Sequence, residues 1–141
     1  MDNKTLIEKF YGSFARADAE GMASCYAPDV VFTDPAFGEL RGDEVATMWR
    51  MLIKNSKGNL AVSVDSIEAN ETTGSAHWVA DYVFSQTGRK VRNSVTARFE
   101  FSNGLITRHT DHFDFWKWTR QALGLPGYLL GWTPFMRNKI Q

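Results

Sequence analysis

Cysteine is almost missing from this chain of 141 residues, in which Cys25 is the only one. No intrachain disulfide can therefore form, and a lone thiol in an apolar helical stretch is typically buried and inert. Neither sign of charge is in excess, because sixteen basic residues balance sixteen acidic ones. Net neutrality gives the chain no overall attraction to nucleic acid or to an anionic membrane. We therefore expect neither a nucleic-acid partner nor a membrane partner.

Long apolar runs are missing as well. No run approaches the ~18 apolar residues that a membrane-spanning helix needs, and residues 1–5 lack the apolar core of a signal peptide. These absences predict a cytoplasmic protein. Glycine-rich phosphate loops and nucleophile elbows are absent too, and the histidines follow no common zinc-binding spacing. We expect no metal and no cofactor.

Apolar residues are plentiful: they make up 43% of the chain, and aromatic residues alone make up 13%. A chain of this length can bury one sizeable core. No repeat, low-complexity segment or linker divides it. The sequence therefore predicts a single domain over residues 1–141, with its core at about 5–115 and an aromatic, helical tail at 116–141.

Helical spacing of apolar residues marks three segments near the N-terminus. The first covers about residues 6–14, the second is short and is stopped by Pro28, and the third begins at Gly42 or Asp43 and ends at 57–59. Strands are predicted at residues 30–33, 60–69, 75–85, 90–101 and 105–115. Helices followed by a meander of strands indicate an α+β fold. We expect a cone-shaped, curved antiparallel sheet wrapped around the N-terminal helices, with an interior.

Aspartate is disfavoured in the middle of a strand, so Asp81 and Asp111 stand out. Strand alternation puts Asp111 on one face with His109 and Phe113, and it puts Asp81 on one face with Val79. In an apolar interior each acid would need a hydrogen bond or an ion pair, and Asp111 could orient His109. Two carboxylates that converge in an apolar cavity would have different pKa values, so that one acts as an acid and the other as a base. The alternative is that one or both face water.

A third acid, Asp34, ends a short apolar strand just before Pro35. A glycine-bearing loop follows, and then the helix that begins near Asp43. A carboxylate at such a junction is held on fixed backbone, as a general base must be. The alternative is a cap or turn role for the Asp-Pro pair.

The motifs Tyr26-Ala-Pro-Asp and Asp34-Pro-Ala-Phe-Gly resemble ketosteroid isomerase and the wider nuclear transport factor 2-like, or SnoaL-like, superfamily. The resemblance covers about residues 5–115. It implies a cystatin-like α+β barrel, commonly a homodimer packed through the outer sheet face, and it makes Asp34 the proton-shuttling base. Ketosteroid isomerase also uses a tyrosine and an aspartic acid as oxyanion donors. Those positions fall on Phe10 and Val95 here, so both donors are missing.

The last strand also resembles limonene epoxide hydrolase and polyketide cyclases of the SnoaL type. In that hydrolase an Asp-Arg-Asp arrangement activates water. Asp111 and Asp81 match its two acids, Val79 stands at the arginine position, and His109 is the available substitute for the missing cation.

Three hypotheses follow. The chain is a proton-transfer enzyme acting on a hydrophobic carbonyl compound with Asp34 as base, a hydrolase or cyclase using Asp81 and Asp111 with His109, or a non-catalytic ligand-binding dimer. In each, the partner is a small hydrophobic molecule. The aromatic tail either completes the core or a dimer interface, or it covers the mouth of the cone. The residues expected to bind the ligand are Phe10, Tyr11, Phe14, Trp49, Val79, Asn93, Val95 and Phe113.

Overall fold

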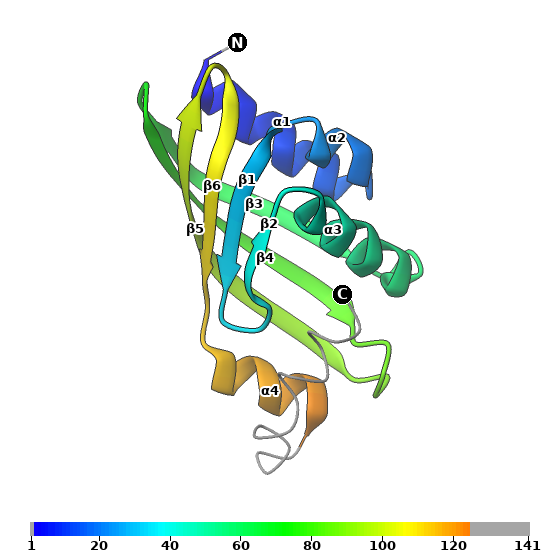
Figure 1. Ribbon diagram of the computed structural model, residues 1–141. Helices are drawn as coiled ribbons and strands as arrows, with labels where there is room; N and C mark the ends of the chain where they lie inside the picture. The colour runs from blue at the N-terminus through cyan, green and yellow to red at the C-terminus, as the bar shows by residue number, and fades with distance from the viewer. Residues whose placement is uncertain (1, 125–141) are drawn as a thin grey trace.

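Residues 2–124 are described by the computed structural model (Figure 1). The helices are α1 (Asn3–Ala15), α2 (Ala19–Ala23), α3 (Asp43–Ser56) and α4 (Phe115–Leu123). The strands are β1 (Tyr26–Asp34), β2 (Gly38–Arg41), β3 (Ala61–Ala69), β4 (Thr73–Val83), β5 (Lys90–Ser102) and β6 (Leu105–His112). The part of the predicted aromatic tail beyond residue 124 lies outside the described residues.

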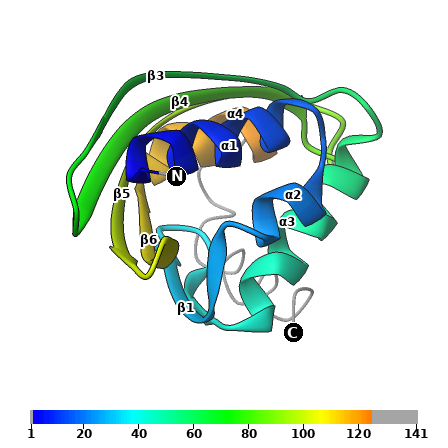
Figure 2. The same ribbon diagram turned by 90° about the horizontal axis from the view of Figure 1, so that it is seen from above.

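The strands form one curved, open sheet in the order β2-β1-β6-β5-β4-β3. Neighbouring strands are antiparallel except β1 and β6, which pair in parallel. Seen from above, β3 and β4 arch over α1, so the helix lies on the concave side of the sheet (Figure 2). A curved sheet packed around N-terminal helices confirms the predicted α+β fold. Within residues 2–124, no helix is long and apolar enough to cross a membrane.

The β1–β2 hairpin departs from the local sequence signals. β1 starts at Tyr26 rather than at Val30, because the Ile106 N–H donates to the Cys25 carbonyl at 2.8 Å and ties this segment to β6. The predicted second helix is correspondingly short. The predicted loop after Asp34 contains a strand, β2, which pairs with β1 over Gly38–Arg41. Strand pairing therefore overrides the weak helix and loop signals here.

Helix ends follow the capping residues. α3 stops where predicted, because Lys57 at its C-cap takes the left-handed conformation with φ of 50°. β6 ends at His112 instead of continuing to residue 115. The reason is Asp114, whose carboxylate accepts the Lys117 N–H at 3.0 Å and starts α4.

The inner faces of β5 and β6 are the predicted ones, but the inner face of β4 is the opposite one. Trp78 and Ala80 are buried on the concave side. Asp81 and Val79 lie on the outer face, where the Asp81 carboxylate pairs with Arg92 at 3.2 Å. The predicted inward placement of Asp81 and Val79 is therefore wrong. Alternation sorts side chains into two sets, and the set with the larger apolar area takes the interior.

Candidate functional site

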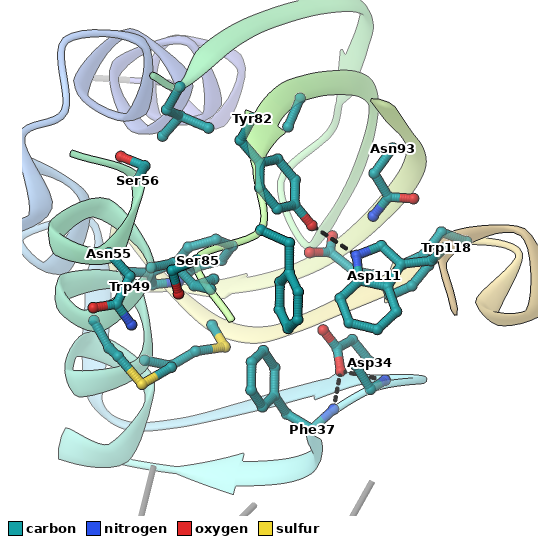
Figure 3. Close-up of a pocket in the computed structure, with 18 of the residues that line it drawn as sticks. Asp34, Phe37, Trp49, Asn55, Ser56, Tyr82, Ser85, Asn93, Asp111 and Trp118 are labelled. Carbon is teal, nitrogen blue, oxygen red and sulfur yellow. Dashed lines mark hydrogen bonds between the residues drawn. The ribbon is translucent and has the colours of Figure 1, made fainter. Parts of the chain in front are cut away.

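The concave side of the sheet holds a pocket of about 280 Å³ between α3, the inner strand faces and α4 (Figure 3). Its walls are mainly apolar and include Met48, Trp49, Leu52 and Phe113. Its polar side chains include Asp34, Tyr82, Asn93 and Asp111. A mostly apolar pocket with a few convergent polar groups is the usual form of a small-molecule site.

Asp111 is the most enclosed acid of the pocket, with 3% of its surface exposed. Its Oδ1 accepts the Trp78 indole N–H at 3.3 Å and lies 2.9 Å from His109 Nε2. Among the described residues, no hydrogen bond reaches its other oxygen, Oδ2. A buried carboxylate needs such partners, since desolvation without them is costly. Oδ1 is therefore the anchored oxygen, and Oδ2 is the one left for a ligand.

His109 lies behind Asp111 and is wholly buried, at 0% exposure. Its Nδ1 is 2.8 Å from the Tyr26 hydroxyl, which accepts the Trp49 indole N–H at 2.9 Å. A chain of hydrogen bonds thus runs from α3 through β1 to β6 and ends at the pocket. A buried network of this kind fixes the position of each member.

Asp34 lines the pocket from the end of β1. Its Oδ1 accepts the backbone N–H groups of Ala36 and Phe37 at 2.9 Å and 2.6 Å. The turn role considered for the Asp-Pro pair is therefore present, and it coexists with a place in the pocket. The turn holds this carboxylate on rigid backbone.

Tyr82 is a polar pocket residue that was not among the site residues predicted from the sequence. Its hydroxyl accepts the Trp118 indole N–H at 2.6 Å. The pKa of Tyr82 is raised to about 12, chiefly because the phenol is buried; the Trp118 hydrogen bond opposes this rise, and the negative charge of Asp34 adds to it. The phenol therefore stays protonated at neutral pH and can donate a hydrogen bond. The available signal was its alternation with Trp78 and Ala80 on the more apolar face of β4.

Figure 3 shows the side chains of Asp34, Tyr82 and Asp111 pointing toward one region of the pocket. These groups come from β1, β4 and β6, which are far apart in the sequence. A ligand oxygen in this region would meet a phenol donor and carboxylate acceptors.

The remaining predicted residues fall into three groups. Phe14, Trp49, Asn93 and Phe113 line the pocket. Phe10, Tyr11 and Val95 are buried in the core and are not among the pocket-lining residues. Asp81 and Val79 are outside it. In the part of the chain that the structure describes, no group of three or more histidine, cysteine or acidic residues could hold a metal ion.

The sequence matches the family model of the SnoaL-like domain over residues 7–109. This chain belongs to the SnoaL-like domain family. No curated protein matches the sequence. Several solved structures resemble this SnoaL-like domain in fold.

One similar structure is a proposed polyketide cyclase of Xanthomonas campestris pv. campestris, with 21% identity, a TM-score of 0.66, and coverage of 83% of this chain and 93% of the other. A second is an LEH-like epoxide hydrolase of M. tuberculosis, with 21% identity, a TM-score of 0.66, and coverage of 90% and 93%. A third is a nuclear transport factor 2-like protein of Burkholderia pseudomallei, with 19% identity, a TM-score of 0.71, and coverage of 87% and 99%. At these identities, the likeness establishes the fold.

Proposed function

We propose that this SnoaL-like domain is an enzyme that moves a proton on a small, mainly apolar carbonyl compound. The observation that carries the proposal is the Asp111 carboxylate, anchored through Oδ1 by Trp78 and His109 and reaching the pocket. A general base must lie on fixed structure within reach of the proton that it removes. Asp111 meets the first requirement, and its place in the pocket allows the second.

In the proposed reaction, Asp111 Oδ2 removes a proton from the carbon next to the substrate carbonyl. The electrons of the broken C–H bond move onto the carbonyl oxygen and form an enolate. Tyr82 donates its hydroxyl proton in a hydrogen bond to that oxygen, as an oxyanion-hole donor does. Asp111 then returns the proton to another carbon, which gives an isomer. Alternatively, the enolate carbon attacks a second carbonyl of the substrate and closes a ring, and Asp111 returns the proton to the resulting alkoxide.

Asp34 is the second carboxylate of this pocket and the alternative base. Its support is its position on the hairpin turn, beside a phenol whose pKa its charge raises. In this alternative, Tyr82 donates the hydrogen bond to the enolate oxygen. It replaces the two oxyanion donors of ketosteroid isomerase, whose positions are occupied by Phe10 and Val95 in this chain. The two assignments share one reaction and differ in the acid that exchanges the proton.

Water-activating chemistry is the second candidate function, favoured by two carboxylates lining one pocket. The pair would be Asp34 and Asp111, because Asp81 lies on the opposite face of the sheet. Hydrolysis of a cyclic epoxide in ¹⁸O-labelled water would then put the label into the diol.

The test uses a β,γ-unsaturated cyclic ketone and a cyclic 1,3-diketone in D₂O, with deuterium uptake at carbon followed by NMR. We expect the wild-type protein to accelerate exchange and Asp111→Asn to lose about 10²- to 10⁴-fold of that rate. Asp81→Asn is the matched control, since it removes an aspartate charge from the outer face of the same sheet. Its rate should equal that of the wild type.

Other outcomes are equally informative. Loss in Asp34→Asn alone, with Asp111→Asn active, would assign the base to Asp34. The proposal would be refuted if Asp34→Asn, Asp81→Asn and Asp111→Asn all exchanged deuterium at the wild-type rate. A ligand that binds wild-type and Asp111→Asn protein equally well, without turnover of either, would favour the non-catalytic binding module.

A further inference from the structure

The hydrogen-bonded chain behind the pocket has a direction that donor and acceptor chemistry fixes. An indole N–H can only donate, so the Tyr26 oxygen accepts from Trp49. The hydroxyl proton of Tyr26 then needs an acceptor of its own. His109 Nδ1, at 2.8 Å, is its only hydrogen-bond partner other than Trp49 among the described residues. Nδ1 must therefore be the ring nitrogen without a proton.

The other end of the imidazole confirms this direction. With Nδ1 accepting, the ring proton lies on Nε2 and points to Asp111 Oδ1 at 2.9 Å. A carboxylate oxygen is an acceptor, so this contact is satisfied as well. The opposite tautomer would place the Nε2 lone pair against the carboxylate and would leave the Tyr26 hydroxyl proton without an acceptor. Burial makes both costly.

Competing polar partners are excluded by the rings around His109. Phe10, Phe32 and Phe99 surround the imidazole, with ring centroids at 5.5, 5.0 and 4.6 Å. The His109 side chain is fully buried, so bulk water cannot replace Tyr26 or Asp111 as its hydrogen-bond partner. The tautomer is thus set by Tyr26 on one side and by Asp111 on the other.

We propose that Tyr26, supported by Trp49, is a positioning residue that fixes His109 in the Nε2–H tautomer and confines proton exchange by Asp111 to Oδ2. Oδ1 faces two N–H donors, from His109 and Trp78, so a proton added there would meet no acceptor. Oδ2 is the remaining oxygen. The part concerning Oδ2 rests on the proposed function, whereas the tautomer does not.

The first experiment measures the tautomer directly by ¹⁵N NMR of the full-length protein labelled at histidine nitrogens. Variants His77→Gln and His112→Gln identify the other two histidine signals by their loss. For wild-type His109 we expect one protonated nitrogen, Nε2, and one unprotonated nitrogen, Nδ1. A proton on Nδ1 would overturn the inference without the need for any variant in the network.

The second experiment removes the hydroxyl with Tyr26→Phe. The Nδ1 and Nε2 shifts of His109 should then move toward each other, as expected when both tautomers are populated. Tyr11→Phe is the matched control, because Tyr11 is also buried and its hydroxyl has no hydrogen-bond partner among the described residues. It should leave the His109 signals in the wild-type tautomer. A folded Tyr26→Phe protein with unchanged His109 signals would contradict the proposal.

Kinetics then separate this inference from the proposed function. With a ketone that the wild type turns over, Tyr26→Phe should lower kcat at least about tenfold and leave KM unchanged, because the base is misaligned rather than the ligand lost. An unchanged kcat would refute the link from Tyr26 to catalysis. If no carbonyl compound is turned over, the proposed function fails, and the NMR measurement still decides the tautomer.

Discussion

Asp111 and Asp81 show that burial, rather than residue type, decides what an aspartate can do in this domain. Asp111 is 3% exposed and held by an indole and an imidazole. The Asp81 side chain is 48% exposed and pairs with Arg92 across two strands. An ion pair at such a surface contributes only ~0–1 kcal/mol. Neutralising Asp81 should therefore disturb neither stability nor the pocket, which is why it serves as a control.

Tyr82 connects the pocket to the alkaline stability of the protein. Its pKa of about 12 in the folded state lies above the ordinary value of about 10. The folded state then holds the phenol proton more tightly than the unfolded state does. This stabilisation is complete below pH ~10 and is lost as the pH rises toward 12.

We predict that the free energy of unfolding falls by about 1.4 kcal/mol more in the wild type than in Tyr82→Phe between pH 9 and pH 11. Urea unfolding at both pH values measures the difference. The variant lacks only the Tyr82 hydroxyl and keeps every other tyrosine. Ionisation of the other tyrosines therefore contributes equally to both proteins and cancels in the difference. A wild-type-to-variant difference that is the same at both pH values would contradict the pKa assignment.

At the scale of elements, α4 supplies hydrogen-bond partners to the part of β5 that β6 does not reach. The Gln121 amide accepts the Arg92 N–H at 2.7 Å and donates to the Arg92 carbonyl at 3.1 Å. Arg89 Nε also donates to the Gln121 carbonyl at 2.8 Å. Gln121 thereby satisfies backbone groups of β5 at Arg92, which lies before the β5–β6 pairing begins at Thr96. They also hold Trp118, whose indole donates to Tyr82, beside the pocket.

We predict that Gln121→Ala increases hydrogen exchange at the Arg92 amide about five- to tenfold, corresponding to the loss of ~1 kcal/mol from one hydrogen bond. The Arg98 amide, within the β5–β6 pairing, serves as an internal reference and should be unchanged. Gln121→Glu is the matched variant, because it keeps the acceptor for the Arg92 N–H. It should lie closer to the wild type than Gln121→Ala does, and equal effects of the two would refute this account.

At the scale of the whole molecule, the two faces of the sheet have different characters. The concave face is packed with aromatic side chains and carries the pocket. The outer face carries the cross-strand ion pairs Asp81–Arg92 and Glu100–Arg108 and a cross-strand hydrogen bond between Asp65 and His77. An interface formed by such a face would be polar, and it would weaken as salt screens its charges.

The homodimer expected from the family resemblance therefore remains a prediction, with the outer face as its surface. Val79 is the apolar side chain between these ion pairs, and Val79→Glu should raise the dimer dissociation constant at least about tenfold by burying an unpaired charge. Sedimentation equilibrium measures it, with Lys4→Glu at an exposed position of α1 as the control. A dimer that survives Val79→Glu would use another surface.

Local patterns in the sequence determined the helices, the meander of strands and the pairing of His109 with Asp111, since residues two apart on a strand share a face. Only the tertiary structure decided which face of β4 points inward, and so excluded Asp81 and brought in Tyr82. It also placed β1 beside β6, which set Tyr26 against His109. Periodicity is a property of neighbours in the chain, whereas burial and strand order depend on how distant segments pack. The candidate site is built from three such segments, and no single one of them reveals it.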